Sequence, residues 1–583
     1  MSDEYAFDEA MLPPFAEKGQ NVPSYLKDHR KRLRERFLGG GGAAAMAHDL
    51  VGTAIKAAGS TEGTPTRVPA SRYTSGAFAE LDLAVGLTLR IADDPAHRSS
   101  IVMVAMSDPK TAVAELDRAG IVVDHRPGFV RVSPHVYNTE DDRHHIIGKE
   151  AKAHEGVSPR NLVASTISDE MVVHNGGRSR AFSVSVKDRG AILPGGHVGK
   201  AFWFSKSSGE FVTSTYYYDD DPAWVKQWNA AKPADAYRDQ SWDLLHDRAT
   251  YVHGQMDDRP YEADLKPLGR TFPHPLGGDT KYFYLFLTLT PVGDALTLDF
   301  AKALVENEKL GHNDTGAPDY LQISFSSTDY IGHLFGPSSL ETEDNLLRLD
   351  RTLADLFQFI DEKVGLDQTL IVLSGDHGAP EAPEYMAELG LSTGRFPFDW
   401  FKTEGPLTEA LQKKFGRSDL IAGHSHPYLY LDPKAVSEAG LDTVAVEQFV
   451  AEALIKIEGI LYAMTRSDLL AGRITESPVQ NQIRRSFHPT RSGNIHMVPE
   501  QYWFLHSTEE AEKMGIGSIA AIHGSPWAYD TFVPIFFAGH SVPAQIIRRR
   551  VAPTDIAVTV TTYLGVKPPS GSVGNPLWEI WRR

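Results

Sequence analysis

Cysteine is absent from the 583 residues of this chain. Its absence excludes disulfides, thiol catalysis and Cys-ligated metal sites, and leaves Asp, Glu and His as the metal ligands available. Long apolar runs are also absent: no stretch approaches eighteen uninterrupted apolar residues, so we expect no transmembrane helix and no membrane partner. The acidic first segment, MSDEYAFDEAMLPPFAEKG, lacks the basic and then apolar pattern of a signal peptide. We therefore expect a cytoplasmic protein.

Positive charge is in deficit. The 58 Lys and Arg residues against 76 Asp and Glu residues give a formal net charge of −18, which disfavours nucleic acid as the main partner. An anionic substrate stays possible, because metal ions and cations can reverse the sign of one pocket. With 42% hydrophobic and 23% charged residues, the composition is that of a soluble globular protein, and the length predicts about two to four domains.

A strand and helix alternation begins near residue 320. YLQISF (320–325) is a short apolar run that predicts a buried strand. A helix should follow from Ser338, with Glu341 completing a capping box and Gly365 ending the helix. The next strand is TLIVLS (369–374), and a connection of this length predicts a parallel βαβ unit. The helix carries an apolar stripe on one face: Leu346, Leu349, Leu353, Leu356 and Ile360.

Carboxylates and imidazoles follow both predicted strands. Asp329 and His333 lie four residues apart in SSTDYIGHLFGP, which we expect to be a loop, and Asp376 and His377 lie in SGDHG. The Asp329 and His333 pair alone would suit a solvated loop. Because chemistry in open parallel sheets sits at the carboxyl ends of strands, the two pairs are instead expected to converge on one crevice.

Two further strand ends carry candidate groups. AFSVSV (181–186) runs into Lys187 and Arg189, which would share one face of an extended chain and could bind one anion. His523 shortly precedes the predicted strand FVPIFFAG. Each group alone would suit a solvated strand end or a core histidine. His424 and His426 form an HxH pattern, and we favour a loop over a metal pair there.

Together these stretches resemble the alkaline phosphatase superfamily, and most closely its monomeric bacterial phosphatases of the PafA type. The motifs are STDYIGHLFGP, SGDHG, KDRGAILPGGH and HGSPWAYDTFVPIFFAGH, which occur in family order within about 155–583. The resemblance implies an α/β fold with a mostly parallel sheet flanked by helices, with cap insertions at about 200–315 and 380–515. It also implies small-molecule phosphate esters as substrates and a monomeric state. Members of this family are usually periplasmic.

The resemblance further implies two zinc ions. Asp329, His333 and His523 would hold one ion, and Asp376 and His377 would contribute to the second, which in the family activates a Thr or Ser nucleophile. Lys187 and Arg189 would bind the non-bridging oxygens of a phosphate monoester. This arrangement suits an in-line displacement at phosphorus. Two metal ions stabilise the attacking and leaving oxygens, and the cations offset the negative charge on the equatorial phosphoryl oxygens.

The sequence departs from the family at its N-terminal side. The family has a strand ending in Asp, then the Thr or Ser nucleophile and a phosphate-binding Asn, and we find no such block. The stretch STEGTPTRVPASRYTS (60–75) has threonines and prolines, but no predicted strand before it and no helix after it. The nucleophile is therefore unassigned, and we expect one well-formed zinc site.

Other resemblances occupy the N-terminal part. Residues 28–51 resemble the opening segment of RadC-type proteins, and residues 72–142 resemble the small domain of class V aminotransferases. The latter range predicts strands at SSIVMVAM, IVVDH and FVRVS around a helix that begins after Asp108. The resemblance would give Arg131 a substrate carboxylate, but the pyridoxal-binding lysine is missing, which favours a structural role.

The sequence therefore predicts a mosaic of three parts. Residues 1–70 would be poorly structured or helical, 71–148 a small α+β segment, and 149–583 the phosphatase-like body. Three functions remain open: a zinc-dependent phosphomonoesterase, a metal-binding pseudoenzyme without a nucleophile, and a phosphodiesterase of the same superfamily. The Lys187 and Arg189 pair favours monoesters, because a diester offers fewer charged oxygens.

Overall fold

The structure is a computed structural model in two compact units, one of residues 1–161 and 214–216 and one of residues 162–213 and 217–583. It describes residues 144–149, 157–401, 405–489, 491–505 and 519–581, together with four short strands between residues 89 and 132. The predicted boundaries at residues 70 and 148 stay predictions.

The first unit contains a small antiparallel sheet in the order β1-β2-β4-β3. The three strands predicted between residues 99 and 133 are confirmed as β2, β3 and β4, in chain order. Arg131 lies opposite Asp124 in the backbone register. The predicted helix after Asp108 lies outside the described residues. The strands are β1 (Leu89–Arg90), β2 (Val102–Ala105), β3 (Asp124–Arg126) and β4 (Phe129–Val132).

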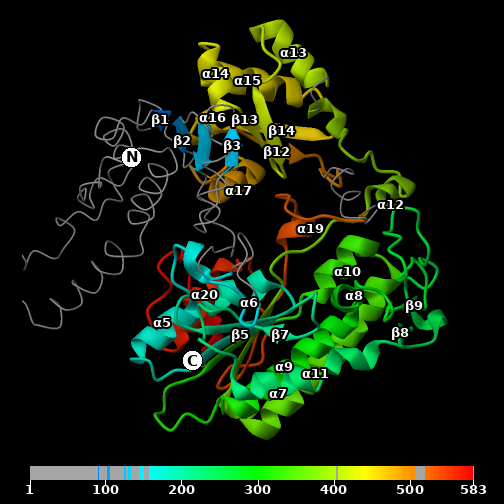
Figure 1. The fold of residues 1–583 in the computed structure, drawn as a ribbon, viewed down its shortest axis with the longest axis vertical. Coiled ribbons are helices and arrows are strands. Elements are labelled where there is room, and N and C mark those ends of the chain that lie inside the picture. Colours follow the sequence, from blue (N-terminus) through cyan, green and yellow to red (C-terminus); the bar gives the residue numbers. More distant parts are fainter. Residues whose placement is uncertain are drawn as a thin grey trace, which may run out of the picture. The chain divides into compact units, whose positions relative to one another are not determined.

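The second unit is built on a sheet in the order β10-β5-β6-β7, of which β5 and β7 are labelled in Figure 1. β10 pairs with β5 and β5 with β6 in parallel, whereas β7 is antiparallel. Every residue of β5 is buried, so the apolar run AFSVSV forms the interior strand its composition predicts. β6 pairs with β5 although it lies within the predicted insertion 200–315. The strands are β5 (Ala181–Ser185), β6 (Lys200–Phe204), β7 (Phe211–Val212) and β10 (Tyr320–Ser324).

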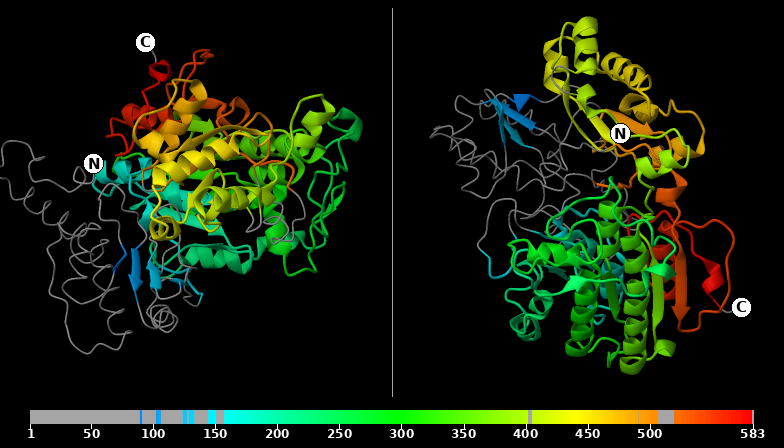
Figure 2. Two further views of the ribbon diagram at one scale, coloured as in Figure 1. Left: turned by 90° about the horizontal axis from the view of Figure 1, so that it is seen from above. Right: turned by 90° about the vertical axis from the view of Figure 1, so that its right-hand side faces the viewer.

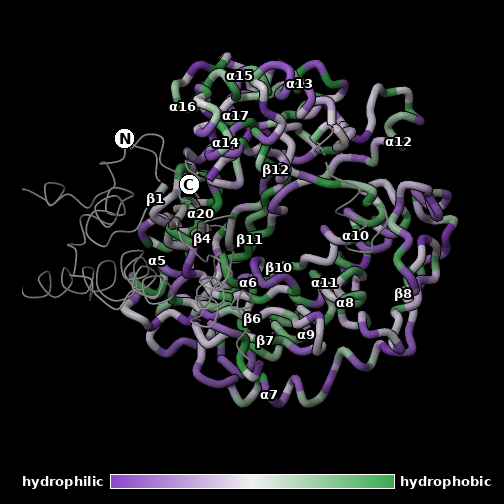
Figure 3. The backbone as a smooth tube through the Cα atoms, turned by 45° about the horizontal axis from the view of Figure 1, so that its top comes forward, coloured by the Kyte–Doolittle hydropathy of each residue, from purple (hydrophilic) through white to green (hydrophobic). Residues whose placement is uncertain are grey.

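A separate two-stranded sheet pairs β11 (Leu370–Ser374) antiparallel with β16 (Ile535–Gly539). The predicted strands and the helix between them are confirmed, but the predicted parallel pairing is wrong, because β10 and β11 lie in different sheets. The expectation that YLQISF forms a buried strand is also wrong: all residues of β10 and of β11 are only half-buried. β11 is drawn largely in the hydrophobic colour in Figure 3, so apolar strands remain incompletely covered.

Helices flank these strands, and the fold class is α/β as predicted. The long helix α11 lies against α9 (Figure 2), and its N-cap is Ser339, one residue after the predicted cap. Four of the helices listed next, α7 to α10, contribute buried side chains to the core that contains Phe202, Phe211 and Phe300. The helices are α5 (Ile167–His174), α6 (Asp188–Gly195), α7 (Ala223–Ala230), α8 (Phe283–Thr288), α9 (Pro291–Asn307), α10 (Ser327–Phe335), α11 (Leu340–Lys363), α12 (Pro383–Glu388), α19 (Ala528–Thr531) and α20 (Thr554–Tyr563).

Residues of the predicted insertion 380–515 form a sheet with its own apolar core. Its order is β12-β13-β15-β14, all antiparallel, and α15 packs on β14 and β15. The strands are β12 (Ile421–Ser425), β13 (Tyr428–Leu431), β14 (Ile460–Thr465) and β15 (Ile495–Pro499), and the helices are α13 (Pro406–Phe415), α14 (Pro433–Glu438), α15 (Thr443–Leu454), α16 (Arg466–Leu470) and α17 (Pro478–Ser486).

Minor elements complete the second unit. β8 (Ser241–Trp242) and β9 (His274–Pro275) form a short antiparallel pair. Among the described residues, none of the helices has the length and hydropathy needed to cross a membrane.

Candidate metal and phosphate site

Helix α10 carries the first two candidate ligands. The expected loop around Asp329 and His333 is wrong: Ser326 is the N-cap of a helix that ends at Gly336, whose φ of 92° favours glycine. A spacing of four residues on a helix places both side chains on one face. The His333 Nε2 atom accordingly lies 3.2 Å from Asp329 Oδ1, and a hydrogen bond of 2.7 Å joins His333 Nδ1 to the Ala521 carbonyl.

His523 reaches the same carboxylate from the segment before α19. Its Nε2 atom lies 3.4 Å from Asp329 Oδ1. The segment is held in shape by Asp530 Oδ2, which accepts from the amides of Gly524 (3.1 Å) and Ser525 (2.7 Å). One ligand atom from each of Asp329, His333 and His523 lies within 4.8 Å of the others, the one such group found among the described residues. This donor set fits a three-ligand zinc site with a fourth position for water.

The groups around Asp329 keep its carboxyl ionised. Burial alone would raise the pKa of this carboxyl, but hydrogen bonds from His333 and His523 and the charge of Lys187 hold the pKa well below its usual range. For His333, burial acts to lower the pKa, and the hydrogen bond and charge of Asp329 outweigh it and raise the pKa. Asp329 is thus ionised and surrounded by groups that respond to its charge.

The second candidate pair follows β11 but supplies fewer ligands. His377 Nε2 lies 3.6 Å from Asp329 Oδ1 and 3.5 Å from Asp376 Oδ2, and its ring stacks on His523 with centroids 3.3 Å apart. The Asp376 side chain is 89% exposed. The described residues offer these two donors and no third of their own, so they do not complete a second metal site.

Two lysines lie at Asp329 and at its neighbour Tyr330, and one of them escaped sequence reasoning. Lys187 is the N-cap of α6, and its Nζ atom pairs with Asp329 Oδ2 and lies 4.3 Å from the Tyr330 ring centroid. Arg189 lies in the first turn of α6, so the expected extended geometry is wrong, and it is exposed. The missed cation is Lys206, whose Nζ donates to Tyr330 Oη at 2.8 Å.

Lys206 follows the carboxyl end of β6, next to β5, so the strand-end rule that selected Lys187 could have found it. Burial lowers the pKa of Lys206; the charge of Asp188 acts to raise this pKa, and the charge of Arg189 lowers it further. The Lys206 Nζ atom lies 4.7 Å from the same Tyr330 ring centroid. Tyr330 therefore lies between two ammonium groups.

Hydroxyl groups near the cluster bond to one another. Ser326 Oγ lies 3.1 Å from Ser185 Oγ and 2.7 Å from Ser324 Oγ, and Ser185 Oγ accepts from the Lys187 amide. None of the described hydroxyls has a contact that marks it as a nucleophile. The stretch 60–75, weighed as a substitute, lies outside the described residues.

Only one of the two histidines of the HxH pattern, His426, lies in a loop as expected. His424 lies in β12, which corrects the expectation, and His426 lies in the turn before β13. The His426 Nε2 atom would be 3.1 Å from a Cβ atom placed on Gly524, so this turn approaches the segment that carries His523.

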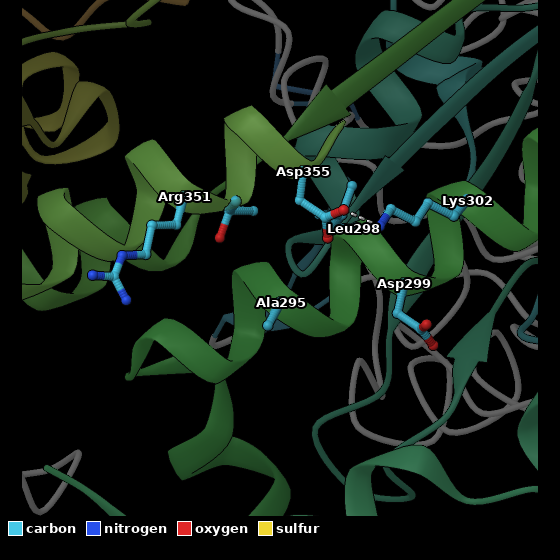
Figure 4. A pocket seen from close by; sticks show the side chains of 7 residues that line it. Ala295, Leu298, Asp299, Lys302, Arg351 and Asp355 are labelled. Carbon is cyan, nitrogen blue, oxygen red and sulfur yellow. Dashed lines mark hydrogen bonds and ion pairs between the residues drawn. The ribbon is translucent and has the colours of Figure 1, made fainter. Parts of the chain in front are cut away.

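A surface hollow of about 480 Å³ lies between α9 and α11 (Figure 4). Lys302 Nζ and Asp355 Oδ1 are joined across it at 2.6 Å. None of the candidate site residues lines it. We therefore do not consider this hollow as an alternative to the candidate site at Asp329.

Comparison with known proteins decides the family. The profile of the type I phosphodiesterase / nucleotide pyrophosphatase family matches residues 139–526. The chain belongs to this family. It is therefore a hydrolase of the alkaline phosphatase superfamily, and the predicted resemblance is confirmed.

Individual relatives are similar in sequence to this chain over most of their length. The chain is 35% identical to a Myroides odoratus protein named calcium-transporting ATPase, over 76% of this chain and 79% of that protein. It is 32% identical to alkaline phosphatase PafA of Elizabethkingia meningoseptica, with 76% and 79% covered. The crystal structure of wild-type PafA matches with a TM-score of 0.69 and 30% identity, covering 80% of this chain and 84% of that one. The family match begins at residue 139, so the resemblances of 28–51 and 72–142 stay predictions.

Proposed function

We propose that this protein binds phosphate monoesters at a zinc site formed by Asp329, His333 and His523, and that it hydrolyses them only slowly. The observation that carries the proposal is the convergence of two imidazoles, from His333 and His523, and of the Lys187 ammonium on the carboxylate of Asp329. A bound zinc ion would act as a Lewis acid that polarises a phosphoryl oxygen.

The chain's own side chains account for binding. Lys187 and Arg189 would bind the equatorial oxygens of the phosphoryl group, and Lys206 would support them through Tyr330. Asp329 would hold both the metal and Lys187, because its Oδ1 faces three imidazoles and its Oδ2 faces the ammonium. The positive charges of Lys187, Arg189 and Lys206 favour a dianionic monoester over a monoanionic diester.

Slow turnover follows from what the described residues do not provide. The described residues include no Thr or Ser positioned as a nucleophile, so they cannot form a covalent phosphoenzyme. In other covalent catalysts, loss of the nucleophile lowers the rate by several powers of ten. The remaining route is direct attack by water on a phosphoryl group held by the cations.

Hydrolysis assays on the full chain test the proposal. With zinc present at alkaline pH, we expect slow hydrolysis of p-nitrophenyl phosphate, no faster hydrolysis of bis-p-nitrophenyl phosphate, and loss of both in the Asp329→Ala, His523→Ala double variant. Robust turnover that is abolished by changing one Ser or Thr within 60–75 would contradict the proposal and identify a nucleophile there.

A further inference from the structure

The ammonium group of Lys206 is half-buried and has no carboxylate partner among the described residues. Its Nζ atom donates a hydrogen bond of 2.8 Å to the hydroxyl of Tyr330. The neighbouring Lys187, in contrast, forms an ion pair with Asp329. A cation that leaves water is ordinarily compensated by an anion or by a set of acceptors. Lys206 therefore has capacity for an anion that the described part of the fold does not supply.

A tight turn between β6 and β7 holds Lys206 in place. The Ser205 amide donates to the Glu210 carbonyl at 2.7 Å, and the Gly209 amide donates to the Ser205 carbonyl at 2.9 Å. Gly209 has a φ of 74°, and a Cβ atom there would lie 2.2 Å from the Tyr284 ring, so the turn packs closely against α8. Because the turn is already ordered, an anion that binds to Lys206 does not have to order it.

The hydroxyl of Tyr330 offers a second donor at the same place. A tyrosine hydroxyl can accept one hydrogen bond and donate another. This hydroxyl accepts from Lys206 Nζ, and no described residue accepts its proton. An ammonium group on the oxygen polarises the O–H bond and makes it a better donor. Lys206 and Tyr330 thus present two adjacent donors that can bind one anion.

These two donors lie next to a cation assigned to the phosphoryl group. The Nζ atoms of Lys187 and Lys206 lie 4.3 Å and 4.7 Å from the centroid of the Tyr330 ring. The two ammonium groups can be no farther apart than these two distances together. A small molecule with two anionic groups on a short linker can therefore reach both of them.

We propose that Lys206 and the Tyr330 hydroxyl form a subsite for a second anionic group of the phosphate monoester, either a carboxylate or a further phosphoryl group. Lys187 and Arg189 would bind the phosphoryl group that is hydrolysed. The inference rests on the proposed function and narrows its substrates to esters with two anionic groups on a short linker. Both kinds of second group offer charged oxygens, which ammonium and hydroxyl donors bind.

Lys200 provides a matched comparison on the same strand. It is half-buried, and its Nζ atom lies 4.6 Å from the Tyr218 ring centroid and donates to the Tyr217 carbonyl. Burial lowers the pKa of both Lys200 and Lys206. Lys200 begins β6, however, and because β10, β5 and β6 are parallel, it lies at the sheet edge opposite to the one that α10 follows. Its loss should therefore not affect the subsite.

Calorimetric titration of the zinc-loaded full chain tests the subsite with three phosphonates. Propylphosphonate has one anionic group, whereas 3-phosphonopropionate and ethane-1,2-diphosphonate carry a carboxylate or a second phosphonate in place of its terminal methyl group. We expect at least one of the two-anion probes to bind about tenfold more tightly than propylphosphonate. The probe that gains identifies the second group as a carboxylate or a phosphoryl group.

Variants assign the gain to the proposed donors. Lys206→Met should weaken the favoured two-anion probe about tenfold more than it weakens propylphosphonate, and Tyr330→Phe should reduce the preference in part. Lys200→Met should leave the preference intact. If circular dichroism shows that Lys206→Met does not fold, Lys206→Gln removes the charge but keeps a donor to Tyr330, and the same loss of preference is expected.

Three results would overturn the inference. Equal affinity of the unaltered chain for all three probes would do so and leave the proposed function standing. An equal loss for all three probes in the Lys206 variants would show that Lys206 acts only on the phosphoryl group that is hydrolysed. Failure of every probe and of inorganic phosphate to bind the zinc-loaded chain would overturn the proposed function together with the inference.

Discussion

At the scale of single residues, Asp329 would connect metal binding with phosphate binding in the proposed site. Its Oδ1 atom faces the imidazoles of His333, His377 and His523, and its Oδ2 atom pairs with Lys187. If one carboxylate serves both functions as proposed, its loss should remove zinc and phosphate together, whereas loss of Lys187 should weaken phosphate binding alone.

Lys187→Met separates the two functions. Because a charge-assisted hydrogen bond contributes about 1.5–3 kcal/mol, we expect inorganic phosphate to bind roughly tenfold to a hundredfold more weakly in the zinc-loaded variant, with zinc content unchanged. Calorimetric titration with phosphate measures this. Lys302→Met, which removes an ion pair with Asp355 on the helices α9 and α11, is the matched control. Unaltered phosphate affinity in Lys187→Met would show that this lysine does not bind substrate.

Glu262 makes stability depend on pH. Burial, and then the charge of Glu341, raises its pKa from 4.5 to about 9, and its Oε1 has no hydrogen-bond partner among the described residues. The folded state therefore holds a proton that the unfolded state releases above 4.5, so this stabilisation is complete below that pH and lost as pH rises toward 9.

Glu262→Gln should remove this dependence, because the amide stays neutral. Relative to the variant, the natural chain should lose roughly 1.4 kcal/mol of unfolding free energy per pH unit as pH rises toward 9. Urea unfolding of both proteins across that range measures the difference. Parallel stability curves would mean that Glu262 is ionised in the fold.

At the scale of elements, two glycines adjacent to His377 and His333 differ in the space available for a side chain. A Cβ atom on Gly378 would lie 2.0 Å from the Tyr529 carbonyl oxygen, whereas one on Gly332 of α10 meets nothing within 4 Å. Gly378→Ala should therefore destabilise the protein by about 2 kcal/mol or more and release zinc. Gly332→Ala should stabilise it by about 0.5–1 kcal/mol and retain zinc. Thermal unfolding with zinc analysis compares them, and equal effects would refute the packing described around His377.

The elements also show how far sequence reasoning reaches. Strand patterns located β5, β10 and β11, and the strand-end rule selected the residues that meet at Asp329, because both depend on short-range signals. The sequence predicts a loop where α10 lies, since Gly332 and Gly336 outweigh the four-residue spacing of Asp329 and His333. The pairing of β11 with β16 could not be read, because it joins segments more than 160 residues apart in the chain and depends on neither local pattern.

At the scale of the whole molecule, exposed apolar side chains predict association. Phe532 is 81% exposed and Phe536 56% exposed, and the strands β10 and β11 add half-buried surface. We expect the chain as it stands to be poorly soluble, and replacement of residues 1–150 by the N-terminal segment of PafA to restore both solubility and phosphatase activity. Light scattering and p-nitrophenyl phosphate hydrolysis check this, and a chimera no more soluble or active than the natural chain would count against it.

The most direct test is the zinc stoichiometry of the full chain, measured by elemental analysis after reconstitution and dialysis. Asp329, His333 and His523 would form a complete three-ligand set, whereas Asp376 and His377 would supply only two donors, and affinity follows ligand number and geometry. We predict about one tightly held zinc ion per chain, lost in the Asp329→Ala, His523→Ala variant and retained in Asp376→Ala. Two tight and equivalent ions, or the same zinc content in the double variant, would contradict the account.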